Sequence, residues 1–99
     1  MTRGTTPLLA FRVGFDTSEI SKLYITISQY RKKVIEKDIS NCQINGNMIT
    51  TRLTQEDTLK LTPDILVEVQ MRCLLDDGNA IASNIISCPA GRILKEGAI

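Results

Sequence analysis

The amino-acid sequence predicts an all-β fold, an antiparallel β-sandwich of six or seven short strands with one short helical turn. Apolar and polar residues alternate over several short runs, and β-branched residues fill these runs. Turn-forming residues separate the runs at intervals of about 8–12 residues, which is typical of sandwiches. A chain of 99 residues with 42% hydrophobic and 23% charged residues has the size and composition of one globular domain.

The first strand is expected in residues 8–15, where Leu9, Phe11 and Val13 occupy alternate positions. Residues 18–34 fit two patterns, because their apolar residues have both strand and helix spacing. The β-branched content favours a second strand, followed by a hairpin tip at residues 30–32 and a third strand at residues 33–37. The pattern alone leaves the helix open.

Two local signals mark the middle of the chain. Asn45-Gly46 predicts a hairpin between short apolar runs. Thr54 lies three residues before Asp57, a spacing that predicts a capping box and a single helical turn reaching Leu59. We expect Leu59 to close the bottom of the sandwich.

The clearest alternation runs from Ile65 to Cys73 and predicts a strand with its Val67, Val69 and Met71 side chains in the core. Asp76-Asp77-Gly78-Asn79 predicts a hairpin, and residues 80–88 the return strand, which ends at Pro89. The expected organisation is a flexible N-terminus at residues 1–7, a sandwich domain at 8–90, and a segment at 91–99. That last segment is expected to form either an arm or a last strand.

The composition argues against an enzyme. Histidine is absent, which removes Ser-His-Asp and Cys-His catalysis, and the six glycines are too scattered for a phosphate-binding loop. No catalytic, cofactor-binding or metal-binding residue is expected, and no cofactor. Cys42, Cys73 and Cys88 are odd in number and widely spaced, so we expect three unpaired thiols in a protein made in the cytosol. No run is long enough to span a membrane.

Two groups of residues are candidates for contact with partners. A basic cluster at the expected hairpin tip comprises Tyr30, Arg31, Lys32 and Lys33. It is most simply a solvated hairpin end, although a tyrosine among cations also suits nucleic acid. The apolar candidates for a protein partner lie on the expected outer face of a strand or in the C-terminal segment: Leu66, Leu74, Ile93, Leu94 and Ile99.

Two stretches carry a resemblance: residues 51–61, TRLTQEDTLKL, and the combination of residues 80–86, AIASNII, with 91–97, GRILKEG. They resemble small proteins encoded in phages and prophages of Gram-positive gut bacteria. More loosely, the strand layout is similar to the immunoglobulin-like domain of phage upper baseplate proteins.

The resemblance implies an immunoglobulin-like β-sandwich with a structural or assembly role in the tail or baseplate of a virion. The expected partners are other virion or phage-encoded proteins, or further copies of this chain, and not a membrane. Such a protein would occupy the host cytoplasm during assembly and then the virion. The alternative is a small intracellular binding adaptor that contacts nucleic acid through residues 30–33.

Overall fold

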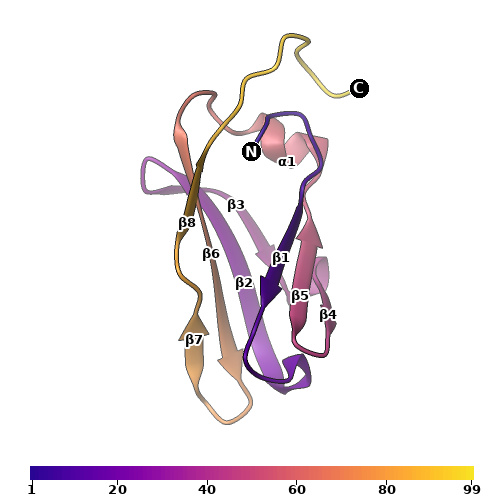
Figure 1. The fold of residues 1–99 in the computed structure, drawn as a ribbon, viewed down its shortest axis with the longest axis vertical. Helices are drawn as coiled ribbons and strands as arrows, with labels where there is room; N and C mark the ends of the chain where they lie inside the picture. Colours follow the sequence, from indigo (N-terminus) through magenta and orange to yellow (C-terminus); the bar gives the residue numbers. More distant parts are fainter.

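The computed structural model describes all residues, 1–99, and confirms the predicted all-β sandwich. Two antiparallel sheets pack against each other (Figure 1). There are eight strands rather than six or seven: β1 (Leu8–Arg12), β2 (Ile20–Gln29), β3 (Lys32–Asp38), β4 (Gln43–Asn45), β5 (Met48–Arg52), β6 (Leu66–Leu75), β7 (Ala80–Ala82) and β8 (Ile86–Pro89). The helix α1 (Gln55–Leu59) and two 3-10 turns, Thr17–Glu19 and Ile39–Asn41, complete the chain.

The strand order is that of an immunoglobulin-like sandwich. One sheet has the order β1-β5-β4, and the other has β3-β2-β6, with β7 and β8 both pairing with the far side of β6. In immunoglobulin notation these are strands B-E-D and C′-C-F-G, and they also follow that order along the chain. No strand occupies the position of strand A, which would lie beside β1.

Residues 20–29 form the ten-residue strand β2, so the helical alternative is wrong. Leu23, Ile25 and Ile27 point inward and are fully buried, as alternate positions of a strand must be when one face covers a core. The hairpin tip is one residue shorter than predicted, because β3 resumes pairing at Lys32 and leaves only Tyr30 and Arg31 in the turn.

The core lies between β2 and β6 on one side and β1 and β5 on the other. Val67, Val69 and Met71 are buried in this core, as predicted, and Phe11, Val13, Ile25 and Ile27 from other strands are buried with them. Ile49 and Thr51 of β5, and Leu53 just after it, are buried too. The 16 apolar members form a single cluster, which confirms the register inferred from the alternation.

The helical turn α1 begins as predicted, with Thr54 as its N-cap. Leu59 does not close the bottom of the sandwich, however. The chain turns again after α1, where the Leu61 amide donates to the Thr58 carbonyl at 3.1 Å, and this turn puts Leu61 in the core. Leu59 is only half-buried and lies beside Gly4 of the N-terminal segment.

The predicted return strand at residues 80–88 is split into β7 and β8. Ser83 causes the break, because its hydroxyl accepts a hydrogen bond from the Met71 amide at 3.0 Å while its own amide donates to the Met71 carbonyl at 2.8 Å. The side chain thus replaces a backbone acceptor, and the ladder is interrupted until Ile86.

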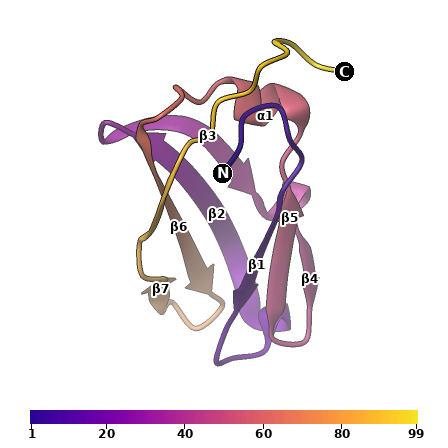
Figure 2. The ribbon, with the colours of Figure 1, turned by 45° about the horizontal axis from the view of Figure 1, so that its top comes forward.

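The N-terminal segment lies across one end of the sandwich, near α1 (Figure 2). Thr2 forms a parallel bridge with Gly91, and the Arg3 guanidinium donates to the Leu61 and Leu59 carbonyls at 2.8 and 3.2 Å. Arg3 therefore satisfies carbonyls at the end of α1. No helix of the chain is long and apolar enough to cross a membrane.

Candidate interaction surfaces

The C-terminal segment after β8 forms no strand. Of the two alternatives predicted for residues 91–99, the last strand is therefore wrong. Gly91 alone forms a β-bridge, an isolated parallel one with Thr2. The remainder runs irregularly beyond the end of the sandwich that carries α1 (Figure 1, yellow). This segment therefore projects as an arm.

The three apolar candidates in this arm have different surroundings. Ile93 is half-buried and packs beside Gly4, where a Cβ would lie 3.1 Å from the Ile93 Cδ1. Leu94 is 94% exposed and Ile99 is 91% exposed. Two polar contacts hold the arm: Arg3 pairs with Glu96 at 3.1 Å, and the Gln55 amide group exchanges hydrogen bonds with the Ile99 backbone. Leu94 and Ile99, but not Ile93, are thus free for contact.

Leu66 and Leu74 both lie on the outer face of β6, as predicted, but they do not form one patch. They are eight positions apart along the strand, a distance of about 26 Å. Leu66 is 53% exposed, whereas Leu74 is half-buried in a shallow hollow of about 310 Å³. They are separate points of contact on one sheet face.

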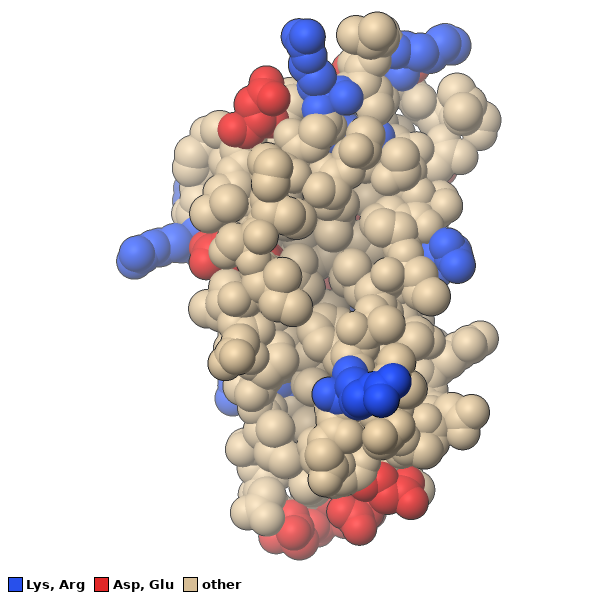
Figure 3. Space-filling view, viewed as in Figure 1, with Lys and Arg blue, Asp and Glu red and all other residues tan.

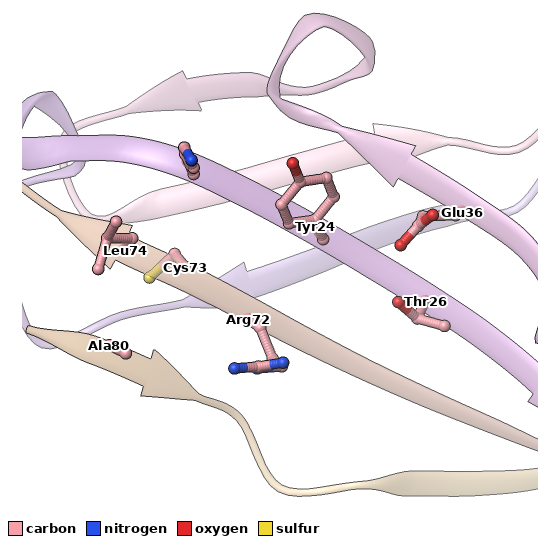
Figure 4. Close-up of a pocket in the computed structure, with 8 residues that line it drawn as sticks. Tyr24, Thr26, Glu36, Arg72, Cys73, Leu74 and Ala80 are labelled. Atoms are coloured by element: carbon pink, nitrogen blue, oxygen red, sulfur yellow. The ribbon is translucent and has the colours of Figure 1, made fainter.

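This hollow lies on the outer face of the larger sheet (Figure 4). Lys22, Tyr24, Thr26, Glu36, Arg72, Cys73, Leu74 and Ala80 line it. The set includes both signs of charge, and one member, Glu36, forms an ion pair with Lys33, which lies outside the lining. Sequence analysis identified Leu74 but not the rest of this site, although its β2 and β6 residues, apart from the buried Cys73, alternate with the core positions of those strands.

The basic cluster lies at the β2–β3 hairpin tip. Tyr30 and Arg31 are the two turn residues, and both have left-handed backbones, with φ of 53° and 59°. Side chains with a Cβ rarely adopt this conformation, which favours Asn and Gly in such turns. Tyr30 is 68% exposed, and Lys33 pairs with Glu36 at 2.9 Å. The tip thus presents an aromatic ring and cations on a strained backbone.

The free edge of β1 is a further surface that sequence analysis did not identify. β1 pairs only with β5, so its other side has no partner. Its sequence, Leu8-Leu9-Ala10-Phe11-Arg12, contains a single charged residue. A strand with so little charge next to Pro7 suggests an edge, but the alternation of apolar and polar residues does not reveal which strand ends a sheet.

Lys37 and Asp57 form a partly buried ion pair at 2.7 Å that joins β3 to α1. Burial by itself raises the pKa of Asp57, but hydrogen bonds from Lys37 and Thr54 outweigh it and hold the pKa below its usual value. All three cysteines are unpaired, as predicted, and burial raises the pKa of the Cys73 thiol. The ion pair links two elements of the fold, and Cys73 is the one cysteine that lines the hollow.

The chain matches no protein-family model, no curated protein and no solved structure at a significant level.

Proposed function

We propose that this chain is a non-enzymatic structural or assembly protein of a phage or prophage, associated with the tail or baseplate, that acts through protein–protein contacts. The resemblance of residues 51–61, 80–86 and 91–97 to small phage proteins supports the phage or prophage origin. The exposed apolar side chains of the arm and the open edge of β1 support action through protein–protein contacts.

The observation that carries the proposal is the exposure of Leu94 and Ile99. Each leaves more than nine-tenths of its surface in water, so burial of such a side chain in a partner contributes about 1.5–3 kcal/mol of binding free energy before other costs. The arm is anchored through exposed polar contacts, which cost little to break. It can therefore leave its own domain and bind another protein.

The experiment combines association with particle composition. Sedimentation velocity would compare the full chain with a Leu94→Asp/Ile99→Asp double variant, each with and without the proteins of particles purified from an induced host. We expect the full chain to be present in the particles and to associate with their proteins. The double variant should lose this association. Absence of the chain from particles contradicts the phage role, and equal association of both forms contradicts the role of the arm.

Residues 30–33 favour a second candidate, a nucleic-acid-binding adaptor, because Tyr30 is exposed on a strained tip beside Arg31 and Lys32. Fluorescence anisotropy with a labelled single-stranded oligonucleotide tests it. Binding that weakens as salt rises, and that Tyr30→Ala abolishes, supports the adaptor. Anisotropy that stays flat at low salt rules it out.

A further inference from the structure

The two sheets of the sandwich have different widths. The smaller sheet is three strands wide, whereas the larger has four strand positions, because β7 and β8 share the place beside β6. Figures 1 and 2 show β7 and β8 lying beyond β1, on the side where the smaller sheet ends. One strand position of the larger sheet therefore extends past the edge of the smaller sheet, and apart from the contact of Met1 with Cys88 no strand covers its inner face.

The side chains at this position confirm the gap. Ile86 is the register partner of Val69, so both project toward the core side of the larger sheet. Val69 is buried, yet Ile86 is 56% exposed. Ile81 and Cys88 face the same way and are half-buried. At the opposite end of this sheet Ile35 of β3 is buried, so the gap lies only beside β7 and β8.

The backbone of β1 is free on this side. The Leu53 amide donates to the Pro7 carbonyl and the Val13 amide donates to the Asn47 carbonyl, which sets the phase of the β1–β5 ladder. In an antiparallel pair the bonded residues alternate. Leu9 and Phe11 therefore bond to β5, and Leu8, Ala10 and Arg12 direct their N–H and C=O groups away from the sheet.

The other three edges carry features that discourage strand addition. β3 contains Lys32, Lys33, Glu36 and Lys37, β4 is three residues long, and the β7–β8 edge is broken at Ser83 and ends at Pro89. β1 has five residues and one charge. Uncharged side chains fill most of the middle of the surface between β1 and β8, and charged ones gather mainly at its ends (Figure 3).

We infer that the free edge of β1 binds a single extended strand donated by another protein, whose apolar side chains at alternate positions cover Ile81 and Ile86. This strand would occupy the position of strand A and complete the smaller sheet. A helix or a loop could not satisfy the three outward N–H and C=O pairs of β1, whereas a strand does so through its backbone.

Two occupants from this chain fit less well. Pairing of β1 with β1 of a second copy would bring the larger sheets of both copies to the same place, because each already extends one position past β1. The arm lacks alternation, since Ile93 and Leu94 are adjacent and project to opposite faces of any strand, and Lys95 and Glu96 follow them. The donated strand therefore comes from a different protein.

The N-terminal segment pairs with the residue that follows β8, not with β1. At the far end of β8, the Gly91 amide donates to the Met1 carbonyl at 2.8 Å and the Arg3 amide donates to the Gly91 carbonyl at 3.0 Å. This parallel contact closes the top of the gap and ends there. The donated strand would fill the remaining length, along β1.

The test tethers candidate strands to the N-terminus by a Gly/Ser linker of about 15 residues, which spans roughly 20 Å on average. One form carries nine residues of alternating valine and threonine, a second carries nine threonines, and a third carries the sequence of residues 90–99. Amide hydrogen exchange is measured by NMR. We expect the valine form to slow exchange at Leu8, Ala10 and Arg12 at least tenfold relative to the threonine form, with Leu9 and Phe11 unchanged.

A proline at position 10 provides the specificity control. Ala10→Pro removes an N–H that the native sheet does not use, and edge strands tolerate proline. It should abolish the protection, whereas Ala10→Ser should keep it. Equal exchange in the valine and threonine forms overturns the inference, as does protection at Ala80 and Ala82 instead. Protection by residues 90–99 alone overturns the assignment to a different protein.

This inference rests on the proposed role in protein–protein contact, but its test is independent of that role. The tethered forms report only on the β1 edge. The Leu94→Asp/Ile99→Asp variant reports only on the arm and on the particle. The strand-binding inference and the proposed function can therefore fail independently.

Discussion

Val69 and Ile86 are opposite each other in the register of β6 and β8, yet Val69 is 5% exposed and Ile86 is 56% exposed. Their side chains project from the same face of the same sheet, so the difference comes from the opposing sheet. That sheet covers Val69 and stops before it reaches Ile86. One face of a sandwich thus contains a core position and an uncovered one side by side.

Matched alanine substitutions measure this difference. Val69→Ala should lower the free energy of unfolding by about 2 kcal/mol, the sum of lost apolar burial and a cavity. Ile86→Ala should lower it by less than about 1 kcal/mol, because most of its side chain is already in water. Chemical denaturation measures both values. Equal losses would mean that Ile86 is covered in the free chain.

The Thr54 cap gives a second prediction. The Asp57 amide donates to the Thr54 hydroxyl at 3.0 Å, and the Thr54 amide donates to the Asp57 carboxylate at 2.9 Å. Thr54→Ala removes one of these bonds and should reduce the free energy of unfolding by about 1 kcal/mol. Thr54→Ser, which keeps the hydroxyl, should restore most of it. A Thr54→Ala variant as stable as the native chain would contradict the role of the cap.

The Lys37–Asp57 pair predicts how stability depends on pH. The pKa of Asp57 is lower in the folded chain than its usual value of 3.8, despite burial, because of the bonds from Lys37 and Thr54. A carboxyl of this kind contributes stability above its unfolded pKa and loses it as the pH falls through the folded pKa. Stability should therefore decline as the pH falls below about 4.

Asp57→Asn isolates this contribution from those of Asp16 and Asp38, whose pKa values are also lowered, by hydrogen bonds from Ser18 and Ser40. It should cost on the order of 2 kcal/mol at pH 7, as expected for a charge-assisted bond, and it should flatten the acid limb of the stability curve. Denaturation midpoints between pH 2.5 and 7 provide the measurement. An acid limb that is unchanged in the variant would exclude the pair as its cause.

The strained hairpin tip predicts a stabilising change. Replacing Tyr30-Arg31 by Asn-Gly supplies residues that tolerate the left-handed backbone, and should raise the free energy of unfolding by about 1–2 kcal/mol. Lys32→Gln, which leaves the turn unaltered, should change it by less than about 0.5 kcal/mol. Thermal unfolding would compare the three forms. Lower stability of the Asn-Gly form would show that Tyr30 and Arg31 make contacts worth more than the strain.

Much of the fold was predictable because local chemistry determines it. Alternation at Leu23–Ile27 and at Val67–Met71 reflects one buried face, and the Thr54–Asp57 spacing determines a cap within a single turn. These signals need no knowledge of which strand neighbours which. The core residues and the helical turn therefore followed from the sequence.

The interaction surfaces were less predictable, because they depend on long-range pairing. Ile86 lies at an alternate position of its strand, as a core residue would, and only the sheet order reveals that the smaller sheet does not cover it. Likewise, the open edge of β1 follows from its having one neighbour, and the break at Ser83 follows from a side chain that competes with the ladder. Composition identified the arm, but not that Ile93 packs against Gly4 while Leu94 does not.

Hydrogen exchange along β1 in the dilute, free chain tests the open edge most directly. Leu9 and Phe11 donate to β5, whereas the amides of Leu8, Ala10 and Arg12 face the empty strand position. NMR-detected exchange should therefore alternate along the strand, with the amides of Leu8, Ala10 and Arg12 at least tenfold faster than those of Leu9 and Phe11. Uniform protection of all five amides would mean that the edge is already paired, and would contradict the account of an unfilled strand position.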